Sequence, residues 1–299
     1  MSTSHIPTDF HYHVRSISLP SRLHPSLPRI EKELKRMKTW DDASKDATSS
    51  MQTEAIKAGL TGLTELYCYV QELIGSPHTQ KALLHHEGKH VEKPLDMSVS
   101  LLDICGSTRE LLLLMKEHVL HLQSAMRRKG LDSSVNDQIC AYICFKKRAK
   151  KDISKRLKAL KTIESSFKPY PLLDIDHHLV MMTNVLRELS KVTISFFRQL
   201  VHFICAPVVL KKHTRGWTLF SKIVSTRCDI EKRSIDYGVA LCYFHKRFRK
   251  IDVKSDVQIV KRRLGEVEWS IGELEAGLDC LFRCLIQQRV SLLNLLTQY

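Results

Sequence analysis

VQIVKRRLGEVEWSIGELEAGLDCLFRCLIQQRVSLLNL, residues 257–295, carries the strongest structural signal in this 299-residue chain. Its apolar residues recur at alternating steps of three and four, and they resume the same register after Gln288. These residues are Val257, Val260, Leu264, Val267, Ile271, Leu274, Leu278, Leu281, Leu285, Leu292 and Leu295. Such spacing puts one apolar stripe along a long helix, as in coiled coils and helical bundles. Because other amphipathic segments exist in the same chain, we expect this stripe to face an internal core, with a homo-oligomer as the alternative.

Three glycines interrupt this segment away from the stripe. Gly265, Gly272 and Gly277 would either let another helix approach closely or weaken the helix by about 1 kcal/mol each relative to alanine. The sequence alone leaves both interpretations open.

The rest of the chain predicts further helices and no sheet. Apolar steps of three and four recur within 27–37, 56–74, 101–122, 135–167 and 175–203. No stretch alternates with the period of two that is typical of a strand, and 11 glycines and 9 prolines supply few tight turns. We therefore predict an all-α fold, an elongated antiparallel helical bundle with long coiled-coil-like helices. The polar segments Trp40–Gln52 and His78–Pro94 are expected to be a loop and a connector.

Two features suggest how the chain is divided. Residues 1–25 lack periodicity and contain Pro7, Pro20 and Pro25, so they predict a flexible, disordered basic arm. Pro169-Tyr170-Pro171 cannot continue a helix and is the best candidate hinge. It would separate an N-terminal helical half, 26–168, from a C-terminal half, 169–299, unless the two form one continuous bundle.

Cysteine usage and the N-terminus indicate the compartment. The nine cysteines are odd in number and scattered, and the polar N-terminus lacks the apolar run of a signal peptide. We expect an intracellular, cytoplasmic protein with free thiols, with a chloroplast transit peptide as a lesser alternative, because Asp9 is the only acid in the arm. The longest apolar stretch, between Lys191 and Lys211, is broken by Arg198 and His202, so no transmembrane helix is predicted.

The sequence offers no recognisable reaction centre. It has no glycine-rich phosphate loop, no G-x-S-x-G and no H-E-x-x-H. Cys140 and Cys144, like Cys280 and Cys284, are four residues apart, but no matching histidine pair completes a zinc site. His118 and His121 share a helix face and are expected to be solvated. We predict no enzyme activity, no metal and no cofactor.

A dense run of cations is the main candidate for binding. The chain has 47 Lys and Arg against 32 Asp and Glu, a formal charge of +15, above the roughly 2–8 that solubility of a small domain requires. The predicted binding residues are Lys146, Lys147, Arg148, Lys150, Lys151, Lys155, Arg156 and Lys158. They could attract an acidic protein, an anionic membrane surface or nucleic acid, or they could form a solvated face without a partner. Nucleic acid is the weakest of these, because the chain lacks aromatic RNA-binding strands and a zinc module.

The arm contains a candidate phosphorylation site. Arg15 lies three residues before Ser18, Ser16 two before it and Pro20 two after it. This resembles the R-S-x-S-x-P ligand of 14-3-3 adaptor proteins, in which phosphoserine pairs with an arginine cluster. An incidental Ser/Arg/Pro tail is the alternative.

Several blocks resemble one plant-specific family, the domain of unknown function 241 family of BYPASS-type proteins. They are HVRSISLPSR (13–22), LLDICGSTR (101–109), MKEHV (115–119), LQSA (122–125), LFRCLI (281–286) and RVSLLN (289–294). The resemblance implies a non-enzymatic role in root and shoot development, and it brings no catalytic residues. Residues 211–250 match the family pattern least.

Two hypotheses follow. The first is a plant helical interaction protein whose arm is regulated by phosphorylation and whose basic helix binds an anionic partner. The second is a peripheral membrane protein whose basic amphipathic helix, Lys146–Phe167, lies on acidic lipid.

Overall fold

The computed structural model describes residues 24–45, 49–84, 89–129, 133–165, 177–205 and 253–297. These residues form helices and no strand, which confirms the predicted all-α class. The helices are α1 (Leu27–Lys45), α2 (Ser49–Ile74), α3 (Pro77–Leu84), α4 (Lys89–Lys129), α5 (Ser133–Ser165), α6 (His177–Cys205) and α9 (Val253–Thr297). None of these described helices is both long enough and apolar enough to cross a membrane.

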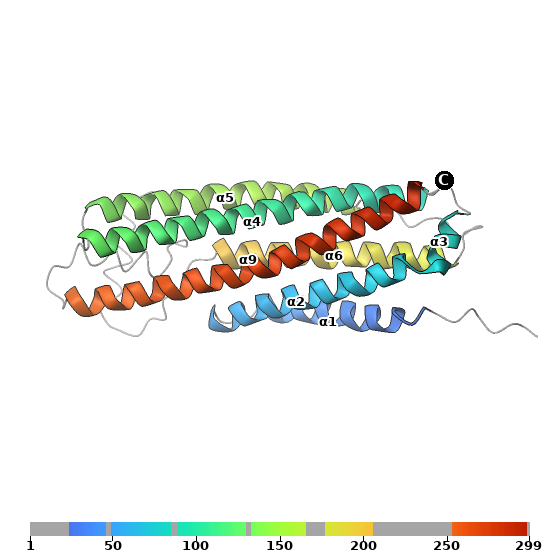
Figure 1. The fold of residues 1–299 in the computed structure, drawn as a ribbon, viewed down its shortest axis with the longest axis horizontal. Helices are drawn as coiled ribbons and strands as arrows, with labels where there is room; N and C mark the ends of the chain where they lie inside the picture. The colour runs from blue at the N-terminus through green and yellow to red at the C-terminus, as the bar shows by residue number, and fades with distance from the viewer. Residues whose placement is uncertain are drawn as a thin grey trace, which may run out of the picture.

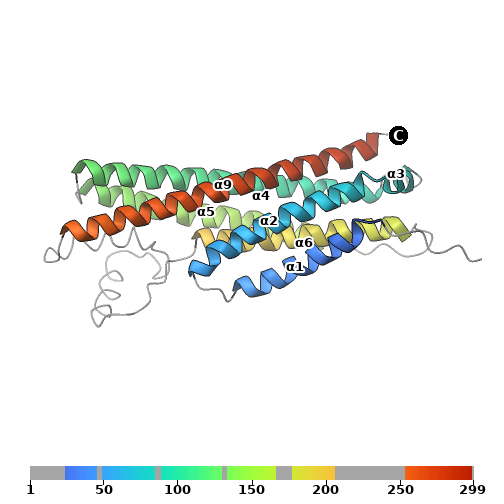
Figure 2. The same ribbon diagram turned by 60° about the horizontal axis from the view of Figure 1, so that its bottom comes forward.

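Four of the helices close into a ring. α9 packs between α2 and α4, and α6 completes the ring by packing against both α4 and α2 (Figure 1). α1 covers α2 and α6, and α5 covers α4 and α6, as the turned view also shows (Figure 2). The long helices lie side by side along the long axis of the molecule, and the short α3 sits at one end.

Side-chain contacts fix the direction in which α9 runs past its neighbours. Lys57 pairs with Glu273, and Gln71 bonds to Ser291 further along, so α2 and α9 are parallel. Against α4 the order reverses, because Arg109 pairs with Asp279 at 2.5 Å and Gln123 bonds to Glu268 at 3.0 Å. α9 is therefore parallel to one neighbour and antiparallel to the other.

The apolar stripe of α9 lies in the core. Its buried members are Leu264, Ile271, Leu274, Leu278, Leu281, Leu285, Leu292 and Leu295. Gln288, which continues the register as a polar residue, is also buried at 7% exposure, whereas Val267 is the exception at 37%. These residues join the buried side chains of the other long helices in a single cluster. Helices from 26–168 and from 169–299 thus share one core, while the proposed hinge at 169–171 lies outside the described residues and the division stays a prediction.

Two segments predicted as irregular are helical. α1 continues past Trp40 to Lys45, because Trp40 packs on Phe196 of α6 (centroids 5.7 Å apart) and its Nε1 donates to the Ala55 carbonyl at 2.6 Å. The end of the same expected loop, residues 49–52, belongs to α2, and the expected connector contains both α3 and the first residues of α4, 89–94. The start of α3 is stabilised by Ser76, since the Ser76 hydroxyl accepts a bond from the Thr79 amide at 3.3 Å. Tertiary contacts and a local cap outweigh the polar composition in these segments.

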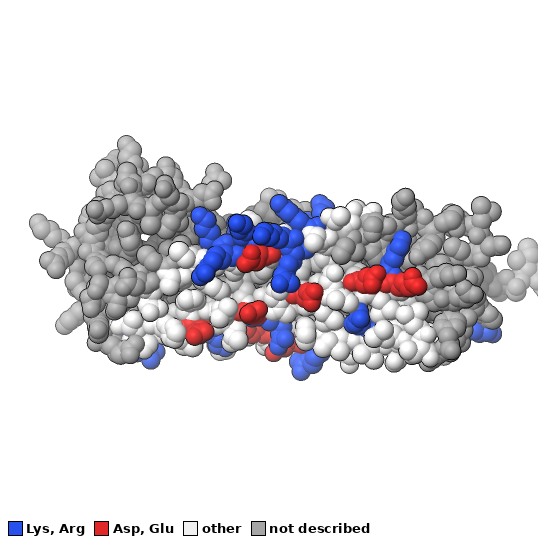
Figure 3. Space-filling model, turned by 90° about the horizontal axis from the view of Figure 1, so that it is seen from above, with Lys and Arg blue, Asp and Glu red and all other residues white. Residues whose placement is uncertain are grey.

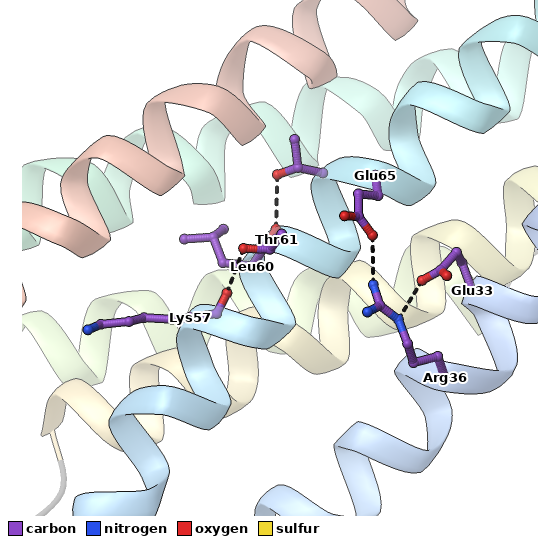
Figure 4. A network of polar contacts seen from close by, with 7 residues as sticks. Glu33, Arg36, Lys57, Leu60, Thr61 and Glu65 are labelled. Atoms are coloured by element: carbon purple, nitrogen blue, oxygen red, sulfur yellow. Dashed lines mark hydrogen bonds and ion pairs between the residues drawn. The ribbon is translucent and has the colours of Figure 1, made fainter.

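The α1–α2 pair shows how close the helices approach. Arg36 of α1 bonds to Glu65 of α2 at 2.8 Å and to Glu33, one turn back on α1, at 2.5 Å (Figure 4). A Cβ placed on Gly59 would come within 2.5 Å of the Trp40 ring, so only glycine fits there without a shift. Gly277 of α9 plays the same part against Leu60, whereas Gly265 and Gly272 face open space. Of the two interpretations of the α9 glycines, close approach applies to Gly277 only.

Candidate anion-binding face

Helix α5 is held to the bundle by one apolar side. Tyr142, Ile153, Leu157 and Leu160 are buried, as the sequence predicts, and Ala149 packs partly buried against the same core. Ile153 and Leu160 are two turns apart and share this face. The opposite side of α5 is therefore left to solvent.

That side carries the predicted cations. In α5 the exposed ones are Lys147, Arg148, Lys150, Lys151, Lys155, Arg156, Lys158 and also Lys161. We call this set the α5 cation face. Figure 3 shows blue side chains gathered over this part of the molecule. Lys146 lies in α5, but its side chain is outside those described.

Among the described residues, none of the cations of the α5 cation face forms an ion pair. Elsewhere in the bundle cations do pair with acids across helices: Lys38 with Glu188 at 2.6 Å, and Lys116 with Glu275 at 2.7 Å. Asp152 is exposed within the run and is not paired with any described cation. Within the described part of the chain, the positive charge of this face is thus not balanced by ion pairs.

The underside of α5 contacts α4 through an aromatic cluster that sequence analysis missed. His118 of α4 lies 5.0 Å from the Phe145 ring and 5.9 Å from the Tyr142 ring, measured between centroids. His118 is partly buried rather than solvated, so that expectation is wrong for this residue. Burial lowers its pKa from the ordinary 6.5, Glu117 acts in the opposite direction, and His121 adds to the lowering. Only the position of α5 over α4 reveals this contact.

The structure gives less information on the phosphorylation motif and on metal binding. The residues of the phosphorylation motif, Arg15, Ser16, Ser18 and Pro20, lie outside the described residues. Within the described ranges, no group of three or more His, Cys, Asp or Glu side chains is arranged to hold a metal ion. Lys161, one turn beyond Lys158 in the same run of cations, is also exposed.

No curated protein and no solved structure gives a significant match. One family model does match, over residues 59–295, and its description is Protein BPS1. The matched span runs from within α2 nearly to the end of α9 and includes the α5 cation face, but not the arm. Because it covers most of the chain and agrees with the resemblance found in the sequence, this protein belongs to the BPS1 family, the BYPASS or domain of unknown function 241 family of plants.

Proposed function

We propose that this protein is a non-enzymatic regulator of root and shoot development that binds an acidic segment of a partner protein through the α5 cation face. Its family indicates a plant developmental regulatory protein. The observation that carries the proposal is the concentration of eight exposed cations on one helix face, none of which forms an ion pair with a described residue, whereas Lys38 and Lys116 elsewhere in the bundle are paired. An external acidic chain would supply the missing charges.

The chemistry of such binding is electrostatic. A single solvent-exposed ion pair contributes about 0.2–1 kcal/mol, so several must act together. The cations of one helix lie on a rigid scaffold, which reduces the entropy lost when an acidic segment binds. Binding of this kind is fast to form and weakens as salt is added.

The packing of α5 favours a protein partner over a lipid surface. An interfacial amphipathic helix buries its apolar side in the headgroup region. In α5 that side is occupied, because Ile153, Leu157 and Leu160 are buried against the bundle. Adsorption to lipid would then depend on charge alone, without the apolar insertion that anchors such helices.

Peptide binding to two charge variants of the protein tests the proposal. The face variant carries Lys147→Gln, Lys151→Gln, Lys155→Gln and Lys158→Gln, and the control variant carries Lys32→Gln, Lys35→Gln, Lys81→Gln and Arg127→Gln. Both remove four exposed positive charges, but the control leaves the α5 cation face intact. A fluorescent Glu-rich peptide should bind wild type and control equally at low salt and bind the face variant about tenfold more weakly.

Three outcomes would contradict the proposal. Equal weakening in both variants would mean that only net charge matters. Binding to anionic vesicles but not to the peptide would transfer the face to the lipid alternative, and binding to duplex DNA alone would transfer it to nucleic acid.

We also propose that the arm is regulated by phosphorylation of Ser18 and capture by a 14-3-3 adaptor. The support is the sequence Arg15-Ser16-Ile17-Ser18-Leu19-Pro20. After treatment with a basophilic kinase, wild type and a neighbouring Ser21→Ala control should be retained on immobilised adaptor, and Ser18→Ala should not. Retention of Ser18→Ala at the wild-type level would exclude this site.

A further inference from the structure

Two cysteines from distant parts of the chain meet where α2 and α9 run in parallel. Cys68 lies on α2 and Cys284 on α9, in the same register as the flanking contacts of Lys57 with Glu273 and of Gln71 with Ser291. Cys68 is also near enough to Cys284 to raise the pKa of its thiol. In the sequence, Cys284 stands out only with Cys280, four residues before it, and no pattern there points to Cys68.

The two thiols differ in their surroundings. Cys68 is exposed, and Cys284 is partly buried against the core. Burial raises the pKa of Cys284 to about 11, and the neighbouring Cys68 adds to this. At neutral pH Cys284 is therefore a protonated thiol, and Cys68 is the member of the pair that a small oxidant in solution reaches first.

None of the other described cysteines is placed to pair with Cys284. Cys280 is four residues before Cys284 on one helix, where Cβ atoms are about 5–6 Å apart, beyond the roughly 3.5–4.5 Å of a disulfide. Cys105 is buried and its thiol is directed at the Leu278 carbonyl, 3.8 Å away. Cys144 lies on α5, which packs against α4 and α6 rather than against α2 or α9.

We propose that Cys68 and Cys284 form a peroxide-responsive dithiol that closes into a disulfide between α2 and α9. In the first step the Cys68 thiol is oxidised by hydrogen peroxide to a sulfenic acid, and one water is released. In the second step Cys284 gives up its proton and its sulfur attacks the Cys68 sulfur; the S–S bond forms, and the hydroxyl group leaves with that proton as a second water. Two thiols are oxidised and one peroxide is reduced to two waters, and a dithiol reductant reverses the change.

The bond would join two members of the central ring. α2 and α9 contact each other directly, so a covalent link between them restrains the unfolded chain over most of its length. We expect the oxidised protein to be more resistant to heat than the reduced one. This inference is independent of the α5 cation face, which lies on a different helix.

The test uses the full-length protein, treated with hydrogen peroxide or left reduced. Digestion without reductant, followed by mass spectrometry, should yield a linked peptide pair containing Cys68 and Cys284, two hydrogen masses lighter than its separate parts. The melting temperature should rise by about 5 °C on oxidation and fall back with dithiothreitol. Cys68→Ser and Cys284→Ala should abolish both effects, while the matched control Cys280→Ser should keep both.

Any of three results would overturn the proposal. One is oxidation of Cys68 to sulfinic acid without the linked peptide. Another is a Cys68 disulfide between two copies of the chain, seen as a covalent dimer. The third is formation of the intramolecular linkage with Cys280 in place of Cys284.

Discussion

At the scale of single residues, two helical glycines have opposite surroundings: one is packed against a neighbouring side chain and the other faces open space. Gly59 lies under the Trp40 ring, which is held in place by Phe196 and by the Ala55 carbonyl. Gly272 of α9 has nothing within 4 Å of the position of an added Cβ. In a free helix, alanine is more favourable than glycine by about 1 kcal/mol, so the surroundings decide the sign of each substitution.

We expect Gly59→Ala and Gly272→Ala to change the free energy of unfolding in opposite directions. Gly272→Ala should raise it by up to about 1 kcal/mol, because the added methyl group meets no neighbour. Gly59→Ala should lower it by about 1–3 kcal/mol, because the fixed Trp40 ring must move. Urea unfolding followed by circular dichroism measures both changes, and stabilisation by Gly59→Ala would show that Trp40 is not packed as described.

At the scale of helices, periodicity predicted α9 well but could not identify every buried position. The regular spacing located the stripe, and eight of its apolar residues are buried. Val267 fits the pattern yet is exposed, because burial also depends on whether a neighbouring helix covers that turn. Gln288 is polar yet buried, because neighbouring helices cover its turn of α9.

The contrast between Leu274 and Val267 gives a test of the α9 core. Leu274→Asp should lower the free energy of unfolding by more than about 4 kcal/mol or prevent folding, because it buries an unpaired charge. Val267→Asp on the same helix should cost far less, since its side chain reaches water. Thermal melts compare the two, and equal melting temperatures would mean that the stripe is not core.

Local sequence could not predict the full length of α1 or the existence of α3. The polar composition of 40–52 and 78–94 favours loops, and composition was the only evidence in the sequence. Trp40 stays helical because Phe196, far away in sequence, packs on it. Long-range contacts of this kind cannot be read from a local window.

Because of the α4–α5 contact, we expect the free energy of unfolding to fall as the pH is lowered into the mildly acidic range. The pKa of His118 is lower in the folded protein than its ordinary value of 6.5, chiefly because of burial. The unfolded chain therefore binds this proton more readily, and the stabilisation present above pH 6.5 is lost as pH falls through the folded pKa. Between pH 7 and pH 5, unfolding free energy should fall less in His118→Gln than in wild type. His202→Gln, which changes an exposed histidine on α6, controls for loss of an imidazole, and an equal effect in both variants would contradict this role of His118.

At the scale of the whole molecule, the sequence predicted the class of fold but not its arrangement. An apolar stripe shows which side of a helix is covered, not which helix covers it. The parallel pairing of α2 with α9, and hence the meeting of Cys68 with Cys284, follows only from the assembled ring. The exposure of the α5 cations was predictable from periodicity, whereas their lack of described ion pairs depends on where the acids of other helices lie.

That lack of ion pairs should affect the stability of the whole bundle. With a formal charge of +15 and a crowded α5 cation face, the folded protein holds like charges close together. Salt screens repulsion between exposed charges, so raising sodium chloride from low to physiological concentration should raise the melting temperature of wild type. The face variant, with four α5 lysines changed to glutamine, should be more stable than wild type at low salt by about 1 kcal/mol, and its melting temperature should respond less to salt.

The control variant has the same net charge as the face variant but keeps the α5 cation face. Its melting temperature should therefore respond to salt nearly as that of wild type does. If the two variants behave alike, the repulsion is spread over the molecule and the charges of α5 carry no special cost. If they differ as expected, the uncomplexed protein is destabilised by this face, and an acidic partner that binds it will raise the melting temperature.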